Sequence, residues 1–162
     1  MSAATQPPQS VPKKESRFML GAAAIMMACA FNHFGDRLLG VRIEIFTGIE
    51  YFSPLWVLDV FVIPFLAGML VSVIYGFGGK WLCYFPPMIV RAISYFEIAQ
   101  ISGVPHGAAL MPLGWWGFFV ILVVEAAVIG GVLGEVVIKR TYGRRDRHLV
   151  YKDSAQPTEK KH

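Results

Sequence analysis

Glu125 is the ionisable residue with the most unusual sequence context. It interrupts the apolar run LGWWGFFVILVVEAAVIGGVLGEVVI, which extends over residues 113–138. A charged side chain at the centre of a membrane helix costs about 2.5–3.5 kcal/mol on insertion scales, so we expect this carboxyl to face protein or water. Two interpretations stay open. Glu125 is either a proton or cation site, or a hydrogen-bonded carboxyl that joins two helices, with Arg91 as a candidate partner.

Asp59 presents a weaker version of the same case. It lies about one turn inside a second apolar run, residues 55–77, where water can reach it. It is either a proton or cation ligand or an interface carboxylate paired with an arginine. A buried arginine needs such a partner, and Arg91 lies in the apolar segment 81–101. The candidates for a proton or cation site, or for a buried ion pair, are Glu125, Asp59, Arg91 and Glu97.

A third set of side chains could bind a metal ion at the predicted outer face. Imidazole and carboxylate groups are ligands for Zn, Fe or Mn, but their spacings here match no metal-binding motif. Two histidines about 73 residues apart could ligate a haem only if their helices adjoin. No metal or cofactor is therefore assigned. The set comprises His33, Asp36, Glu44, Glu50, Asp59, Glu97 and His106, with His33, Asp36 and His106 as the main candidates.

Catalytic motifs are not evident in the chain. A nucleophile and its base must be adjacent in space, which spacing alone does not show, and no glycine motif has the spacing of a phosphate loop. Cys29 and Cys83 both lie in apolar stretches, so a disulfide framework is not expected. The sequence therefore does not indicate an enzyme.

The composition predicts an integral membrane protein. Of the 162 residues, 55% are hydrophobic and 16% are charged, whereas soluble domains usually carry about a quarter charged residues. The apolar residues also occur in long blocks. The net charge of +4 comes mostly from the two tails. It indicates membrane topology and attraction to anionic lipid rather than nucleic-acid binding.

Three segments are predicted to cross the membrane, at residues 18–34, 55–77 and 113–138. The segment 81–101 is ambiguous, because it is apolar but contains two prolines and two charged residues. Excess Lys and Arg mark the cytoplasmic side, and basic clusters precede the first span and follow the last. Both termini are therefore predicted to be cytoplasmic, which requires an even number of crossings. We predict an all-α bundle of four transmembrane helices. Three helices plus a re-entrant or interfacial segment are the alternative.

The remaining segments have simpler interpretations. We expect residues 1–17 to form a disordered cytoplasmic tail, residues 18–138 the membrane domain, and residues 139–162 a basic cytoplasmic tail. Residues 36–54 alternate charged and apolar side chains, which predicts an amphipathic segment at the membrane interface. Near the inner end of the last span, Glu135 precedes Lys139 by four residues, a favourable spacing for an ion pair.

Small residues predict where the membrane helices touch. Gly130 and Gly134 are four residues apart, the small-xxx-small spacing that allows close backbone approach between helices. Gly68 is a second position, in the span 55–77, at which the lack of a side chain allows another helix to approach closely. We expect these three glycines to lie at helix contacts.

These features are compatible with three classes of function. The first is a non-catalytic membrane subunit of a larger transport or energy-transducing assembly. The second is a small proton- or cation-coupled transporter or channel component that uses Glu125 and Asp59. The third is a metal- or haem-binding membrane protein that uses the outer-face set. The expected partners are the lipid bilayer and other membrane subunits or further copies of the chain. The Lys/Arg bias favours a bacterial inner membrane.

Overall fold

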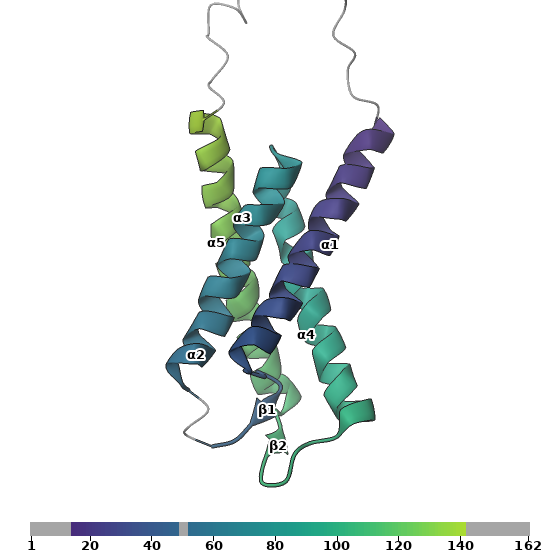
Figure 1. The fold of residues 1–162 in the computed structure, drawn as a ribbon, viewed down its shortest axis with the longest axis vertical. Coiled ribbons are helices and arrows are strands. Elements are labelled where there is room, and N and C mark those ends of the chain that lie inside the picture. Colours follow the sequence, from purple (N-terminus) through teal and green to yellow (C-terminus); the bar gives the residue numbers. More distant parts are fainter. Residues whose placement is uncertain (1–13, 49–51, 142–162) are drawn as a thin grey trace, which may run out of the picture.

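Helices account for most of the computed structural model, which describes residues 14–48 and 52–141 (Figure 1). A two-stranded ribbon lies at one end of the bundle, and α1 begins and α5 ends at the other end. The elements in chain order are α1 (Lys14–Leu39), β1 (Ile45–Phe46), α2 (Pro54–Val57), the π-helix η2 (Leu58–Val62), α3 (Ile63–Tyr75), the 3₁₀-helix η3 (Gly79–Tyr84), α4 (Phe85–Glu97), the π-helix η4 (Ile98–Ser102), β2 (Ala109–Leu110) and α5 (Leu113–Thr141).

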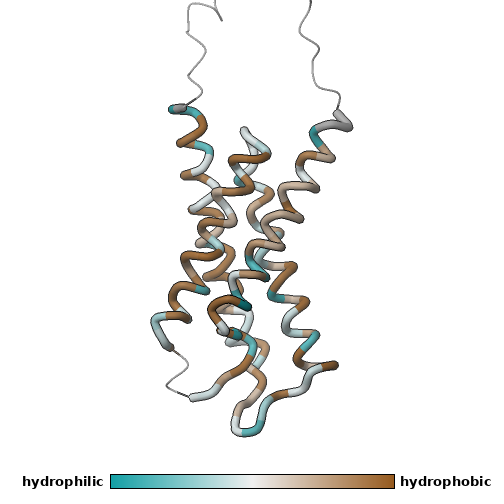
Figure 2. Tube along the Cα trace, in the orientation of Figure 1, coloured by the Kyte–Doolittle hydropathy of each residue, from teal (hydrophilic) through white to brown (hydrophobic). Residues whose placement is uncertain are grey.

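Three helical stretches are long and apolar enough to cross a membrane: Arg17–Leu39, Pro54–Tyr75 and Leu113–Arg140. They correspond to the three spans predicted from hydropathy. Figure 2 shows hydrophobic residues along these helices and hydrophilic ones mainly towards the ends of the bundle. The first stretch ends later than residue 34, where the sequence placed its boundary, so Asp36 and Arg37 belong to the last turn of α1.

The second stretch is one helical path made of α2, η2 and α3. Ser53 caps its beginning by accepting a hydrogen bond from the backbone N–H of Trp56 at 3.2 Å, and Pro54 occupies the first turn, where a missing N–H costs nothing. Pro64 further along cannot donate to an earlier carbonyl, and the wider π-helical turn η2 precedes it. Asp59 lies in that π-helical turn.

The ambiguous segment 81–101 is helical in the structure. It forms the end of η3, all of α4 and most of η4, and α4 runs alongside α1 towards the ribbon end (Figure 1). Pro86 and Pro87 fall in the first turn of α4, the position that tolerates proline. Gly103, with φ of +69°, ends the helical run.

Residues 36–48 of the segment predicted to lie at the membrane interface form the last turn of α1, then extended chain and β1. Gly40 adopts a φ of +66° and ends α1, and the chain then becomes extended. β1 pairs antiparallel with β2, with Ile45 opposite Leu110, and the backbone N–H of Met111 donates to the Glu44 carbonyl at 2.8 Å. Because of these pairings, the segment lies against the end of the bundle, where Glu44 is buried.

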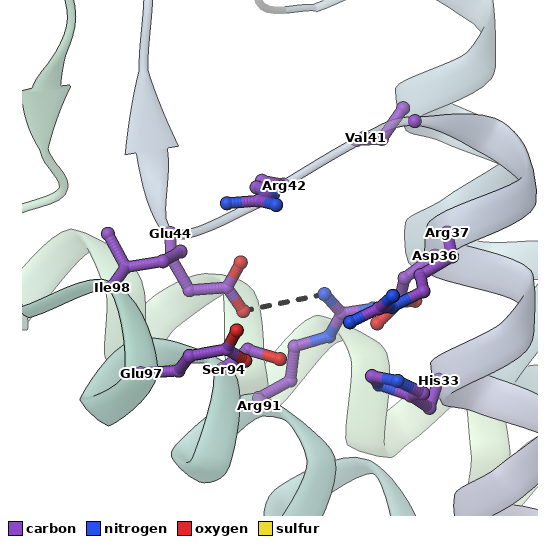
Figure 3. Close-up of a pocket in the computed structure, with 11 residues that line it drawn as sticks. His33, Asp36, Arg37, Val41, Arg42, Glu44, Arg91, Ser94, Glu97 and Ile98 are labelled. Carbon is purple, nitrogen blue, oxygen red and sulfur yellow. Dashed lines mark hydrogen bonds and ion pairs between the residues drawn. The ribbon is translucent and has the colours of Figure 1, made fainter. Parts of the chain in front are cut away.

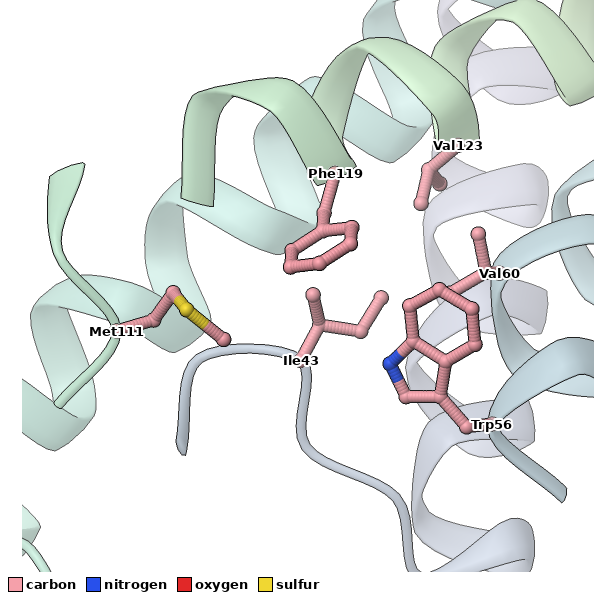
Figure 4. Close-up of a cluster of buried hydrophobic side chains, with 6 residues drawn as sticks. All are labelled: Ile43, Trp56, Val60, Met111, Phe119 and Val123. Carbon is pink, nitrogen blue, oxygen red and sulfur yellow. The ribbon is translucent and has the colours of Figure 1, made fainter. Parts of the chain in front are cut away.

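Two apolar clusters form the interior. The first lies at the ribbon end (Figure 4) and contains Ile43, Trp56, Val60, Met111, Phe119 and Val123. The second lies further along α1 and α3, towards the end where α1 begins, and contains Ala24, Ala28, Ala67, Val71 and Cys83. We call the second group the alanine layer. Its small side chains let α1 and α3 approach closely.

The glycines expected at helix contacts lie between α3 and α5. A Cβ atom added at Gly130 would overlap the carbonyl oxygen of Phe65 in α3, and one added at Gly68 would overlap the carbonyl oxygen of Ala127 in α5. A Cβ at Gly134 would lie 2.8 Å from Cβ of Ser72. Only residues without a side chain allow the two backbones to come this close.

Candidate functional site: a buried arginine and three carboxylates

Arg91 is the centre of a buried ionic cluster near the ribbon end of the bundle (Figure 3). Its guanidinium Nη2 donates to Oδ1 of Asp36. It also donates, at 3.3 Å, to Oδ2 of Asp59, which Figure 3 does not draw. Its Nη1 donates to Oε1 of Glu44 at 3.5 Å. Only 2% of the Arg91 side chain is exposed. We call these four residues the Arg91 cluster.

Four separate segments supply the members of the Arg91 cluster. Asp36 comes from the last turn of α1, and Glu44 from the extended chain just before β1. Asp59 projects from the π-helical turn η2, and Arg91 lies in the middle of α4. Single π-helical turns occur often at functional sites, because the extra residue reorients a side chain locally. The cluster therefore depends on the tertiary arrangement of the whole ribbon end.

Its charges do not balance. If every group is ionised, three carboxylates face one guanidinium, which leaves two excess negative charges. The Asp59 side chain is fully buried, that of Glu44 is 1% exposed, and that of Asp36 is 11% exposed. Burying an unpaired charge is expensive, by several kcal/mol for each ion even after relaxation. Three buried carboxylates around one guanidinium therefore favour additional positive charge nearby, and Arg37 and Arg42 line the same pocket as Arg91.

Two further observations agree with this imbalance. Oδ1 of Asp59 is buried and has no hydrogen-bond partner within the described ranges 14–48 and 52–141. Glu44 lies outside the membrane-spanning stretches, and burial raises the pKa of its carboxyl above its ordinary value. The charge of Arg91 acts in the opposite direction, while that of Asp36 raises the Glu44 pKa further. Burial thus favours the protonated form of Glu44.

A pocket of about 420 Å³ gives access to the Arg91 cluster (Figure 3). It lies between the end of α1, the chain leading to β1, and the end of α4. His33, Arg37 and Arg42 are exposed at this pocket, whereas Arg91 and Glu44 are buried at its base. Its full lining is His33, Asp36, Arg37, Gly40, Val41, Arg42, Glu44, Arg91, Ser94, Glu97 and Ile98.

The structure brings together some of the residues singled out from the sequence and separates others. Asp59 and Arg91 form an ion pair, and Glu97 lines the same pocket. Glu125 lies elsewhere, on an exposed face of α5. The pairing of Glu125 with Arg91 considered above does not occur, because Arg91 lies at the ribbon end, where its guanidinium binds three other carboxylates.

The candidate metal ligands divide between two places. His33 and Asp36 line the pocket beside the Arg91 cluster, whereas His106 lines a second pocket of about 360 Å³ beside the ribbon. Within the part of the chain that the structure describes, no group of three or more His, Cys, Asp or Glu residues is arranged to hold a metal ion. Glu50 lies outside the described residues.

Sequence reasoning missed two members of the site and one local interaction. Asp36 and Glu44 were considered as metal ligands rather than as partners of Arg91. Glu135 was expected to pair with Lys139, but its Oε1 accepts hydrogen bonds from the backbone N–H groups of Gly78, at 3.0 Å, and Lys80, at 3.2 Å. Lys139 instead places its Nζ 5.2 Å from the ring centroid of Phe77.

Comparison with known proteins adds no assignment. No protein-family model matches the chain, and no curated protein or solved structure matches it.

Proposed function

We propose that this protein is a membrane-embedded component that binds and releases a proton at the Arg91 cluster. The observation that supports this function is the presence of three buried carboxylates around one guanidinium. Asp36 and Asp59 both approach the same nitrogen of Arg91, so they lie close to each other. Two neighbouring carboxylates in a buried site repel each other, which favours the binding of additional positive charge there.

Access to the cluster is unequal on its two sides. On the ribbon side, the pocket reaches Asp36, whose side chain is 11% exposed, so protons can exchange with water there. On the other side lie buried Asn32 and then the alanine layer, whose Cys83 thiol adjoins the buried side chains of Ser72 and Glu135. In this conformation the pocket opens the cluster to the ribbon side. A proton path across the membrane needs a conformational change or a partner protein. This requirement favours a subunit of an assembly over a protein that conducts protons on its own.

The proposal is tested by the pH dependence of unfolding of the purified protein in detergent. The folded wild type is expected to bind a proton that the unfolded chain releases, so its stability falls as pH rises above the ordinary carboxyl range and through the raised pKa. Asp59→Asn replaces one carboxyl by a neutral group of the same shape and is expected to weaken this dependence. Ser94→Ala, a neutral change in the same pocket, is the control. Equal pH dependence in wild type and Asp59→Asn would exclude a proton site here.

The same measurement distinguishes a proton from a cation. If Na⁺ or K⁺ replaces the proton, adding that ion at high pH restores the stability of the wild type and not that of Asp59→Asn. If neither pH nor these ions changes the difference in stability between wild type and Asp59→Asn, the cluster is a structural ion-pair network.

A second candidate function is that of a non-catalytic subunit of a larger membrane assembly. The observation that favours it is the exposed position of Glu125 midway along α5, since a carboxyl in lipid needs a partner. Purification in mild detergent tests it. Stable co-purification of other membrane proteins is expected from a subunit, whereas a protein that purifies alone with an intact proton site supports the first function only.

We further infer four membrane crossings with both termini in the cytoplasm, in a bacterial-type inner membrane. The helical run through α4 is the proposed additional crossing, and the start of α1 lies at the same end of the bundle as the end of α5 (Figure 1). Reporter fusions at Ser2 and His162 test this topology. Reporters located on opposite sides of the membrane would reduce the crossings to three and make residues 81–101 re-entrant or interfacial.

A further inference from the structure

The pocket at the Arg91 cluster carries charges of opposite sign at its base and at its opening. Glu44 and Asp36 lie at the base, with 1% and 11% of their side chains exposed, and half-buried Glu97 lines the pocket from α4. Arg37 and Arg42 line the same pocket but are exposed. This arrangement matches a zwitterion whose ammonium enters the pocket and whose anionic group stays at the opening.

Polar groups around this pocket lack partners within the chain. The Glu44 carboxyl, which Figure 3 shows pointing into the pocket, accepts through Oε1 from Arg91 at the long distance of 3.5 Å. Its Oε2 accepts no hydrogen bond from any other residue in the described ranges. In those same ranges, Glu97, Arg37 and Arg42 form no ion pair. A buried carboxylate oxygen needs a donor, and a ligand in the pocket can supply it.

We propose that this pocket binds a phosphoethanolamine group, with its ammonium at Glu44 and Glu97 and its phosphate at Arg37 and Arg42. A primary ammonium has three N–H donors, which suit two carboxyls and the Ser94 hydroxyl. The planar guanidinium groups at the opening suit a phosphate. The ammonium also supplies the additional positive charge that the buried carboxylates favour.

The position of the pocket favours a lipid headgroup as the source of this group. The membrane-spanning stretch Arg17–Leu39 ends within the pocket lining, which is the depth at which headgroups lie. Phe34, Leu38 and Phe96 are more than half exposed, and each directly adjoins a lining residue in the sequence. They supply apolar surface for acyl chains beside the pocket. A soluble phosphoethanolamine ester has the same charged groups without the chains.

The phosphoethanolamine site goes beyond the function proposed for the cluster, since it needs no transfer of a proton. Asp59 is not among the residues that line the pocket. Asp59→Asn therefore tests the proton site, whereas changes at Glu97 and Arg42 test the ligand site. Either site can fail its test while the other passes.

Retention of lipid by the purified protein tests the proposal. The protein is reconstituted in vesicles of equal amounts of phosphatidylethanolamine and phosphatidylcholine with identical acyl chains, extracted in mild detergent and examined by native mass spectrometry. The two headgroups carry the same charges, but the trimethylammonium of phosphatidylcholine donates no hydrogen bond. We expect at least about ten-fold more bound phosphatidylethanolamine, because the buried carboxyl loses its donor in the other complex. Equal retention of the two lipids would overturn the proposal.

Two substitutions at the pocket test the individual contacts. Glu97→Gln removes a carboxylate that receives the ammonium and is expected to bring the ratio of the two lipids close to one. Arg42→Gln removes a guanidinium at the phosphate and is expected to lower the retained phosphatidylethanolamine about ten-fold. Glu125→Gln and Arg140→Gln are matched controls on α5, outside the pocket, and should behave like wild type. An unchanged result in either pocket variant would overturn the proposal.

Free phosphoethanolamine distinguishes the two sources of the group. Displacement of the bound lipid from wild type by phosphoethanolamine, and not by phosphocholine, supports a site that recognises the group alone and accepts soluble esters. Retention of the lipid against both compounds supports a site that also needs acyl chains. Equal displacement by both compounds would overturn the proposal, because the site would then not distinguish a primary ammonium.

Discussion

Gly130→Ala tests whether α3 and α5 meet at their backbones. A Cβ atom at this position would lie 1.9 Å from the carbonyl oxygen of Phe65, whereas ordinary contact begins at 3.4 Å. The helices must therefore move apart by about 1.5 Å, the difference between these two distances. Since the obstacle is backbone rather than a flexible side chain, the cost should lie in the upper part of the usual range for overpacking, about 1–3 kcal/mol.

The intrinsic preference of alanine for helices acts in the opposite direction. It contributes about 0.5–1 kcal/mol, so we expect Gly130→Ala to lower the free energy of unfolding by about 2 kcal/mol. Gly117→Ala in the same helix is the matched control, because a Cβ there would meet no atom within 4 Å. Gly117→Ala should therefore gain only the stabilisation that comes from the higher helix propensity of alanine. Thermal or denaturant unfolding in detergent measures both, and equal stability of the two variants would refute the close contact.

Three other substitutions have defined outcomes. Arg91→Leu leaves three buried carboxyls without a cation and should cost about 3–5 kcal/mol, with Arg91→Lys intermediate; a stable leucine variant in denaturant unfolding would contradict the cluster. Because burial raises the Glu44 pKa above 4.5, its folded form binds protons more tightly than its unfolded form. Its contribution to stability is therefore lost as pH rises through the raised pKa, and Glu44→Gln should remove that part of the pH profile. Glu135→Ala leaves the N–H groups of Gly78 and Lys80 without their acceptor and should cost about 1–3 kcal/mol, whereas Glu135→Gln should retain most of the stability.

Hydropathy located the three long helices because the signal is local: each is a nearly unbroken apolar run of sufficient length. The glycine spacing in α5 was similarly informative about a helix contact. The two-residue strands β1 and β2 could not be predicted, since they are too short for any periodicity and depend on each other across the chain. The π-helical turn at Asp59 likewise follows from its surroundings rather than from a sequence signal.

The Arg91 cluster was only partly predictable. The sequence indicates that a buried arginine needs a carboxylate, but not which one, because Asp36, Glu44 and Asp59 come from three separate segments. For Glu125, a signal existed. At about 100° per residue, Glu125 and Gly134 point about 180° apart on the helix, so a glycine face against α3 places the glutamate on the opposite side. The sequence alone would have placed Glu125 on the outer face if Gly130 and Gly134 had first been assigned to the face of α5 that contacts another helix.

The central claim is that the Arg91 cluster holds a proton in the folded protein, and infrared spectroscopy tests it most directly. A protonated carboxyl has a C=O stretching band that a carboxylate lacks. The measurement is best made on Glu125→Gln protein, so that the carboxyl on the outer face of α5 does not contribute. We predict a protonated-carboxyl band at neutral pH that is lost when Asp59→Asn is added. Absence of the band at neutral pH, or a band that Asp59→Asn leaves unchanged, would contradict the claim.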